Sequence, residues 1–317
     1  MKTIAITGAT GYLGRPLVSK LIARGDRVLA FTRDRGRAQQ ALGDRDLDDR
    51  LDVIEADLEG EGPWQEHLAG VDAVVHLAGE NLGAKRWDAR VKQIIRDSRV
   101  ESARHIVEGI AALEPARRPK AIITASGADY YDWVDDALDD DEEFDESQPA
   151  GGTFLSRLCK AWEDESVRAE ELGVRVVRMR TGVVLGPGGA LAKMTTPFKL
   201  FVGGKIGKGT QWFSWIHRDD ALAAYTAAID DPRYKGPINL VAPEASRAKD
   251  VAKAVGHALH RPSWLPVPGF AVKAAAGELA EYLLHGRKVI PRALEQLGFA
   301  FTHPHLEEAV ATSLTPA

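Results

Sequence analysis

Along residues 1–184, short apolar runs alternate with longer stretches in which apolar residues recur every three or four positions. The short runs have the length of buried strands, and the longer stretches have the spacing of one helix face. Strands are predicted at 3–7, 27–32, 51–58, 72–82, 119–126 and 174–182, and helices at 15–25, at 88–113 and from about Thr153. Repeated strand–helix units predict an α/β fold: a Rossmann-type, doubly wound parallel sheet with its ligand at the carboxyl ends of the strands.

The stretch GATGYLG, residues 8–14, joins the first predicted strand to the first predicted helix. In such a loop Gly8 permits the tight turn, Gly11 lets the backbone approach a pyrophosphate, and Gly14 lets the helix pack closely on the strand. The helix amino terminus adds free N–H groups and a partial positive charge. We therefore expect a dinucleotide cofactor to contact Gly8, Thr10, Gly11, Tyr12, Leu13 and Gly14.

The end of the second predicted strand bears on which cofactor is bound. The strand ends at Thr32, and Arg33 and Asp34 follow it. Arg33 could pair with the 2′-phosphate of NADP, whereas Asp34 lies near the position of an acid that would favour NAD. The sequence favours NADP and leaves NAD open; the alternative is that both residues are a solvated pair.

Two further strand ends are expected to contact the cofactor. The third predicted strand ends in Asp57-Leu58, placed to touch the adenine, and the fourth leads into a small-residue exit. At that exit the expected contacts are Leu77, Ala78, Gly79 and Glu80.

Several motifs together resemble a known family. They are GATGYLG, HLAGENL (76–82), VRVVRMRTGVVLGPGGAL (174–191) and GKGTQWFSWIHRDDAL (207–222), with C-terminal stretches at 261–284 and 289–301. With these, the chain resembles an atypical extended short-chain dehydrogenase/reductase, of the epimerase family branch with a C-terminal domain of unknown function. We expect residues 1–184 to form the NAD(P)-binding domain, with a returning segment near 215–242. Residues 185–317 are expected to form a smaller substrate-side and C-terminal domain.

The resemblance implies an acid/base pair that this chain lacks. The superfamily uses a Tyr hydroxyl and, four residues later, a Lys that lowers the pKa of the Tyr. In GGTFLSRLCKAWE, residues 151–163, one register places Leu155 and Cys159 at these positions, and the other places Phe154 and Leu158. Neither register supplies the pair, and the helix is expected to turn Leu155, Leu158, Cys159 and Trp162 inward.

Other residues could replace the missing pair. Ser126 and Tyr131, at the exit of the fifth predicted strand, are the leading catalytic candidates. Tyr130, Glu80, Lys160 and His217 are further candidates, and each has an ordinary structural alternative. Trp212, Phe213 and Trp215 could wall a substrate pocket or form core, with alternate residues facing opposite ways.

The segment DWVDDALDDDEEFDE, residues 132–146, carries ten acids and no Lys or Arg. It accounts for the net charge of −5, since the rest of the chain has 41 basic against 36 acidic residues. We expect a mobile, solvated surface loop outside the core, with an acidic flap beside the active site as the alternative.

Composition narrows the classes of function. The single cysteine excludes an internal disulfide, no metal-ligand spacing appears, and no basic stripe indicates nucleic acid. No signal peptide or membrane span is expected, so a cytoplasmic monomer or homodimer with a small-molecule substrate is the expectation. The predicted function is that of an NADP(H)-binding epimerase- or reductase-like protein, acting on a small carbonyl, imine or sugar-like substrate with a nonstandard acid/base. The alternative is an NADP(H)-binding sensor or scaffold without turnover.

Overall fold

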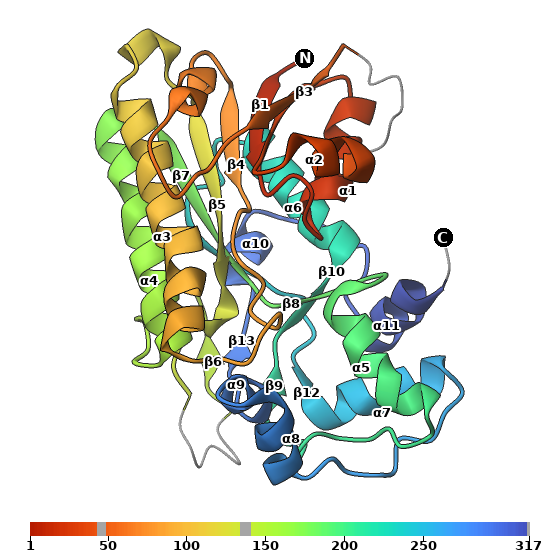
Figure 1. Ribbon diagram of the computed structural model, residues 1–317. Coiled ribbons are helices and arrows are strands. Elements are labelled where there is room, and N and C mark those ends of the chain that lie inside the picture. Colours follow the sequence, from red (N-terminus) through yellow and green to blue (C-terminus); the bar gives the residue numbers. More distant parts are fainter. Residues whose placement is uncertain (43–48, 134–140, 316–317) are drawn as a thin grey trace.

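A seven-stranded parallel sheet forms the centre of the computed structural model, which describes residues 1–42, 49–133 and 141–315 (Figure 1). Its strand order is β11-β7-β5-β4-β1-β2-β3, and each neighbouring pair runs parallel. The strands are β1 (Thr3–Thr7), β2 (Arg27–Thr32), β3 (Leu51–Glu55), β4 (Ala73–His76), β5 (Ala121–Gly127), β7 (Arg175–Thr181) and β11 (Gly236–Leu240). The predicted Rossmann-type, doubly wound sheet is confirmed.

Helices cover both faces of this sheet (Figure 1). On one face lie α1 (Gly14–Ala23), α2 (Arg35–Leu42) and α6 (Arg218–Asp230); on the other lie α3 (Ala89–Ala111) and α4 (Phe154–Val167). Each face has its own apolar core, as expected for a parallel sheet buried on both sides. Leu17 and Leu21 of α1 belong to one core, and Ile106 and Ile110 of α3 belong to the other.

Two strands end earlier than predicted: β3, and β4, which ends at His76 although the prediction extends it to residue 82. Strands β1 and β2 have the predicted bounds, and Thr153 caps α4 by accepting a hydrogen bond from the Ser156 N–H. Strand β3 ends at Glu55, so the prediction that this strand runs to Asp57-Leu58 is wrong. Thr32 is the last β2 residue paired with β3, and beyond Glu55 there is no β2 partner to extend the ladder.

The strand order reverses at β1, because β2 and β3 lie on one side of it and β4, β5 and β7 on the other. In a doubly wound sheet, the connections leaving two strands diverge at this point and leave a crevice for a ligand. The residues at the ends of β1 and β4 are therefore the first to examine.

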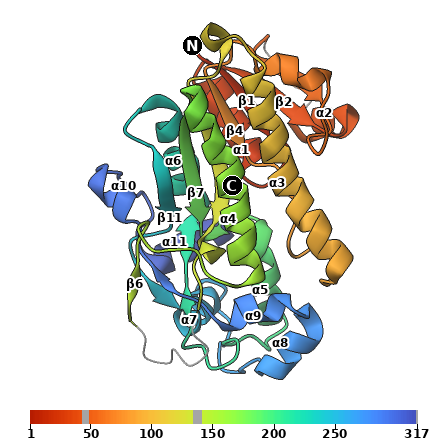
Figure 2. The same cartoon turned by 90° about the vertical axis from the view of Figure 1, so that its left-hand side faces the viewer.

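The second half of the chain adds to the sheet and forms a smaller unit. The segment containing α6 and β11 returns to the sheet, where β11 pairs with β7. The smaller unit lies at the end opposite the N-terminus in both views (Figures 1 and 2). Its helices and strands are α5 (Gly189–Lys199), α7 (Ala248–Ala258), α8 (Gly269–Ala276), α9 (Leu279–Leu284), α11 (Leu306–Leu314), β8 (Val183–Leu185), β9 (Trp212–Phe213), β10 (Trp215–His217) and β12 (Ser246–Arg247). Helix α10 (Arg292–Gln296) packs beside β11, with Leu294 in the core of the sheet.

The acidic segment is packed at both described ends, whereas its residues 134–140 lie outside the described residues. Glu143–Phe144 forms β6, which pairs in parallel with β13 (Lys288–Val289), and Phe144 packs beside Tyr131. Residues 141–143 are exposed, as predicted, but the prediction that the segment lies outside the core is wrong for Phe144 and Glu146, which pack against the sheet. The cause is tertiary: Asp141 pairs with Arg247 at 2.7 Å, and Glu143 pairs with Lys288 at 3.2 Å.

Glu146 joins this segment to the sheet by hydrogen bonds, and replacing its side chain should lower the stability of the protein measurably. Its carboxylate accepts hydrogen bonds from the Asn239 N–H at 2.8 Å and the Ala293 N–H at 3.2 Å. Glu146→Ala would leave both donors without these partners, which should lower the free energy of unfolding by about 1–3 kcal/mol. Urea denaturation measures this, with exposed Glu61→Ala as the control; equal midpoints for the two variants would contradict the prediction.

Among the helices in the described ranges, none is both long and apolar enough to cross a membrane.

Candidate functional site

The glycine loop after β1 has the close packing that its sequence predicts. The Gly11 N–H donates to the Gly8 carbonyl oxygen at 2.9 Å, which closes the turn. A Cβ atom on Gly14 would lie 2.1 Å from that same oxygen, so only glycine fits there. Gly8 has a φ of 65°, and a Cβ on it would lie 2.7 Å from the Leu77 carbonyl carbon. The loop and the exit of β4 are therefore in contact.

Buried side chains hold the exit of β4 in place. The Thr7 hydroxyl oxygen accepts hydrogen bonds from the N–H groups of Leu77 and Ala78, both at 3.2 Å, and lies 2.7 Å from His76 Nδ1. Burial lowers the pKa of His76 to about 4, so this ring is neutral near pH 7. The predicted contacts Leu77, Ala78 and Gly79 are thus fixed beside the glycine loop.

Arg99 of α3 brings a buried positive charge to the same exit, and the sequence analysis did not single it out. Its guanidinium donates to the Glu80 carbonyl oxygen at 2.9 Å and to the Ile95 carbonyl oxygen at 3.1 Å. A Cβ on Gly79 would lie 3.0 Å from Arg99 Cζ. In the described part of the chain no carboxylate pairs with Arg99, so its charge is available to an anionic or electron-rich ligand.

The end of β2 gives Arg33 and Asp34 different environments. The Arg33 side chain is 72% exposed, and its nearest carboxylate, Glu80, is 3.9 Å away. Asp34 instead accepts a hydrogen bond from the Arg37 N–H at 2.9 Å and pairs with the Arg37 guanidinium at 3.3 Å. The Asp34 carboxylate is therefore engaged with the first turn of α2, whereas the Arg33 guanidinium is largely open to solvent.

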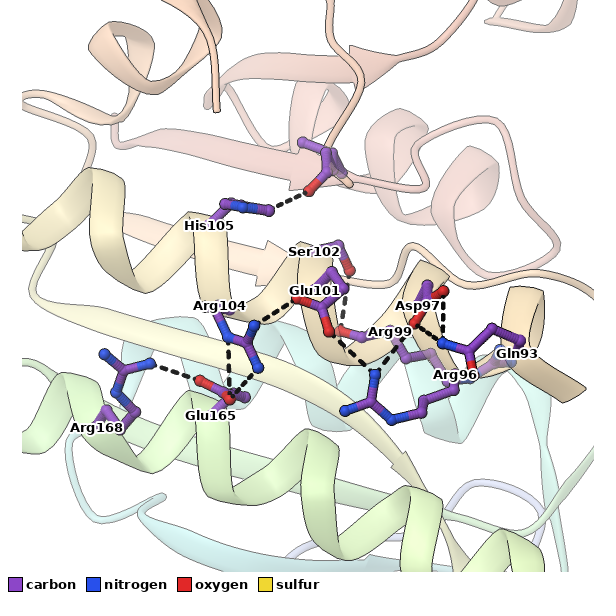
Figure 3. A network of polar contacts seen from close by, with 11 residues as sticks. Gln93, Arg96, Asp97, Arg99, Glu101, Ser102, Arg104, His105, Glu165 and Arg168 are labelled. Carbon is purple, nitrogen blue, oxygen red and sulfur yellow. Dashed lines mark hydrogen bonds and ion pairs between the residues drawn. The ribbon is translucent and has the colours of Figure 1, made fainter. Parts of the chain in front are cut away.

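The loop after β3 is attached to α3. Asp57 accepts a hydrogen bond from the Glu59 N–H at 3.1 Å, and His105 Nδ1 lies 3.3 Å from the Leu58 carbonyl oxygen. Figure 3 shows His105 reaching toward this loop from α3, while Arg104 reaches the other way to Glu165 of α4, at 3.0 Å. The helix thus ties the Asp57-Leu58 loop to the packed face of the sheet.

Helix α4 offers no acid or base where the superfamily pair would lie. Leu155, Leu158, Cys159 and Trp162 are all buried, as predicted. All but Cys159 pack in one cluster with Trp87 and Ile95. Burial raises the pKa of the Cys159 thiol to about 12, so it is protonated at neutral pH. Lys160 is exposed and pairs with Asp164 at 2.6 Å, so it does not replace the missing Lys.

The leading catalytic candidates from the sequence, Ser126 and Tyr131, lie in one buried network. The Ser126 hydroxyl donates to Glu163 at 2.7 Å, and Glu163 pairs with Arg180 at 2.9 Å. The Tyr131 hydroxyl accepts from Arg180 at 2.9 Å and donates to the Asn239 side chain at 2.7 Å.

This network changes the interpretation of both residues. Tyr131 is 1% exposed and Ser126 is 6% exposed, so protein surrounds both side chains almost completely. Burial raises the pKa of Tyr131 to about 12. Tyr130 lies beside them, with its ring centroid 3.4 Å from Arg180 Cζ. These contacts favour structural roles for Ser126 and Tyr131; a catalytic role for either stays a prediction without geometric support.

The aromatic segment of the smaller unit is divided between core and surface. Trp215 is buried and its indole N–H donates to the Ser246 hydroxyl at 3.0 Å. Trp212 and Phe213 are only partly buried and line a small recess together with Glu244, Arg287, Lys288 and Val289. The expected mixture of core and pocket residues fits this arrangement.

Folding also brings His303 close to His217 and Asp219, which gives three residues of the kinds that bind metal ions. His217, Asp219 and His303 offer ligand atoms within 4.8 Å of one another. However, His217 Nδ1 already accepts a hydrogen bond from the Asp219 N–H at 3.2 Å, as the cap of α6. His217 is thus engaged as a helix cap, and a catalytic role for it has no support from its position.

The doubly wound sheet, the glycine loop and the reversal of strand order at β1 define a Rossmann-type dinucleotide-binding protein. The model of the NAD dependent epimerase/dehydratase family matches residues 4–241, and a domain of unknown function, DUF1731, matches residues 267–312. The chain therefore belongs to the NAD dependent epimerase/dehydratase family, in its branch of epimerase family proteins with this C-terminal domain.

Similar proteins span the chain almost completely. An epimerase family protein SDR39U1 homolog from Arabidopsis thaliana, described as chloroplastic, is 38% identical over 97% of this chain and 85% of its own length. YfhF from Bacillus subtilis is 33% identical over 97% of this chain and 96% of its own length.

Solved structures agree with this membership. The human epimerase family protein SDR39U1, isoform 2, solved with NADPH, is 32% identical, has a TM-score of 0.82 and matches 98% of each chain. A nucleoside-diphosphate sugar epimerase from Corynebacterium glutamicum is 31% identical with a TM-score of 0.75, over 99% of this chain and 58% of that one.

Proposed function

We propose that this protein binds NADP(H) and acts as an epimerase- or reductase-like enzyme on a small carbonyl, imine or sugar-like substrate, with a nonstandard acid/base. When bound, the cofactor supplies or accepts a hydride. The chain's own part is to hold the pyrophosphate at the glycine loop and to orient the nicotinamide at the exits of β4 and β5. It also moves a proton with a group other than the usual Tyr.

The glycine loop carries the cofactor part of this proposal. A Cβ on Gly14 would lie 2.1 Å from the Gly8 carbonyl oxygen, so this packing requires glycine. Packed this closely, the loop presents the first turn of α1 to the crevice, where free N–H groups favour an anion. The human relative, similar over 98% of this chain, was solved with NADPH.

Arg33 supports NADP rather than NAD. It stands at the end of β2 with its guanidinium largely exposed, and Arg35 and Arg37 follow it on the exposed first turn of α2. Asp34, the competing acid, is engaged with Arg37. A 2′-phosphate at this position would meet cations and a helix amino terminus together.

Arg33→Ala should weaken NADPH binding by roughly tenfold to a hundredfold, because one hydrogen-bonded charged contact contributes about 1.5–3 kcal/mol. NADH has no 2′-phosphate and should bind the variant as it binds the original protein. Isothermal titration with both cofactors measures the difference. Arg233→Ala removes an exposed arginine paired with Asp231 and is the matched control. A preference for NADH that the Arg33 variant leaves unchanged would refute the NADP assignment.

The enzyme part of the proposal rests on the substrate side. A smaller unit with a partly aromatic recess lies next to the sheet, which supports a place for a substrate beside the cofactor. The alternative, a sensor or scaffold that binds NADP(H) without turnover, is favoured by one observation: neither register of α4 supplies the Tyr and Lys pair, and Leu155, Leu158 and Cys159 are buried.

A measurement of turnover distinguishes the enzyme from the sensor or scaffold. The purified protein is incubated with NADPH and a panel of aldehydes, ketones, imines and nucleotide sugars, and both cofactor oxidation and product formation are followed. Conversion of any member above the rate with free cofactor supports the enzyme. Tight NADPH binding with no conversion across the whole panel supports the sensor or scaffold.

A further inference from the structure

Asp129 follows directly on β5, in the short helical turn Ala128–Tyr130. Its backbone carbonyl oxygen accepts a hydrogen bond from the Ser156 hydroxyl at 2.8 Å, which fixes the turn against the start of α4. Its carboxylate, by contrast, has no hydrogen bond or ion pair to any residue of the described ranges. The residue is partly buried and partly exposed to solvent. An enclosed carboxylate that remains accessible and has no partner is suited to contact a ligand.

The position of this carboxylate coincides with the place of the missing acid/base pair. A Cβ atom built on Gly127, the last residue of β5, would lie 3.7 Å from Asp129 Oδ2 and 3.3 Å from Cys159 Sγ. In the register that places Leu155 and Cys159 at the superfamily pair, Cys159 stands where the Lys is expected. Asp129 therefore reaches the same corner, between the end of β5 and α4, from the strand rather than from the helix.

Tyr282, on α9 of the smaller unit, contacts the start of α4 at this corner. The Tyr282 hydroxyl accepts a hydrogen bond from the Leu155 N–H at 3.0 Å, and Leu155 stands where the superfamily Tyr is expected. Burial raises the pKa of Tyr282, and the charge of Asp129 adds to this, so the two groups are close enough to interact. The wall of the site is therefore built partly by the domain of unknown function.

Within the described ranges, the other titratable and charged groups on α3, α4 and the exit of β4 have partners of their own or do not titrate near neutral pH. On α4, Cys159 is a protonated thiol and Glu163 is paired with Arg180. On α3, Arg99 binds backbone carbonyl groups, and Lys92 pairs with Glu278. Glu80, after β4, has Arg33 as its nearest cation.

Asp129 is the member of this group that titrates near neutrality. Burial raises its pKa to about 6, whereas the Cys159 thiol remains protonated and the buried His76 ring remains neutral above about pH 4. The raised pKa agrees with the geometry, since a carboxylate without partners is poorly stabilised in its charged form.

We propose that Asp129 faces the nicotinamide ring and is the group that exchanges a proton in this site. This inference rests on the proposed NADP(H) binding and deepens it by naming the nonstandard acid/base. A bound cofactor would supply the hydride for reduction of the substrate C=O or C=N bond. The Asp129 carboxylic acid would give its proton to the oxygen or nitrogen that takes the electron pair of that bond, and the carboxylate would be reprotonated from water. In the opposite direction, the Asp129 carboxylate would accept the proton of the hydroxyl or amine, with the cofactor as hydride acceptor.

The arrangement predicts that protonation of Asp129 is linked to the oxidation state of the cofactor. NADP⁺ and NADPH share the adenosine and phosphate groups and differ in the nicotinamide ring, which is cationic when oxidised and neutral when reduced. A cation beside Asp129 favours its charged form, so NADP⁺ should bind more tightly above about pH 6 than below it. NADPH should lack this dependence.

The experiment measures the ratio of the dissociation constants of NADP⁺ and NADPH between about pH 5 and pH 8. Groups that affect both cofactors equally cancel in this ratio. We expect the ratio to fall by about tenfold with rising pH, which corresponds to a shift of one pKa unit. The slope should vanish in Asp129→Asn and persist in Asp129→Glu. Asp164→Asn, which removes an exposed acid from α4, is the control and should keep the slope.

The titration of the Asp129 carboxyl group can also be followed directly, which completes the test. With ¹³C-labelled aspartate, the signal that is absent in Asp129→Asn should titrate near pH 6 in the free protein and at lower pH with NADP⁺ bound. A flat ratio in the original protein, or a slope that survives in Asp129→Asn, overturns this inference while leaving cofactor binding intact. Failure of both cofactors to bind overturns the proposed function instead. Asp129→Asn should fold, because it removes an unpartnered charge, and circular dichroism verifies this.

Discussion

Replacing Gly14 by alanine is expected to weaken NADP(H) binding by more than tenfold and to destabilise the fold. The added Cβ would lie 2.1 Å from the Gly8 carbonyl oxygen, and the Ala9 Cα would be 2.8 Å away. These are backbone atoms, so no side-chain rotation relieves the overlap. Either α1 moves away from β1 or the turn closed by Gly11 and Gly8 opens, and both changes displace the N–H groups that face the pyrophosphate.

The stability cost of Gly14→Ala should be about 1–3 kcal/mol, typical of overpacking at a tight contact. Thermal unfolding and isothermal titration with NADPH measure the two effects separately. Gly60→Ala is the matched control, since a Cβ there would meet nothing within 4 Å. A Gly14 variant that binds NADPH as tightly as the Gly60 variant would show that the loop does not hold the cofactor.

The second large effect is expected at the buried ion pair between Arg180 and Glu163. Their side chains are 3% and 2% exposed, and the guanidinium binds both carboxylate oxygens, each at 2.9 Å. Arg180→Met would remove the guanidinium that binds both oxygens, and would leave the buried Glu163 carboxylate with only the long contact to Arg178, at 3.5 Å, and the Ser126 hydroxyl. Removing one member of a buried pair costs about 3–5 kcal/mol.

The double variant Arg180→Met, Glu163→Met tests whether the loss of stability comes from the unpaired Glu163 carboxylate. Replacing both charges by apolar groups removes the unpaired carboxylate, so much of the lost stability should return. Urea denaturation of the two single variants and the double variant gives the interaction energy between the residues. Lys160→Met, which breaks an exposed pair with Asp164, should cost about 0.5 kcal/mol and is the control. A loss below about 1 kcal/mol in Arg180→Met would refute the structural role given to this network.

The network also explains why the sequence misplaced its leading catalytic candidates. Tyr131 follows a strand end, as catalytic residues often do, and its sequence position gives no sign that it is buried. Its hydroxyl is held by Asn239, 108 residues away, and by Arg180 of β7. Strand β11, which carries Asn239, joins the sheet only through the returning segment. Such partners are set by the order of strands in the sheet, which local patterns do not encode.

Local patterns did predict the elements that form the cofactor half. Strands β1 and β2 have their predicted bounds, because a run of apolar residues buried on both faces ends where glycine or charge begins. Strand β3 was predicted too long, since Ala56 and Leu58 are apolar and buried but continue past the partner residues of β2. Buried apolar residues just outside a strand ladder give the same sequence pattern as residues within a strand. Only the pairing of neighbouring strands distinguishes the two cases.

By itself the sequence determined the doubly wound sheet, the glycine loop at its first turn and the absence of the Tyr and Lys pair on α4. These depend on residue period, on the space available to glycine and on residue identity, all of which are local properties. Only the tertiary structure decided that Ser126 and Tyr131 are buried, that Asp129 lies beside Cys159, and that Tyr282 contacts the start of α4. The Tyr282 hydroxyl meets the Leu155 N–H across 127 residues of chain. The physical reason is that contacts between distant segments depend on how whole helices and strands pack, and no spacing within one segment records that.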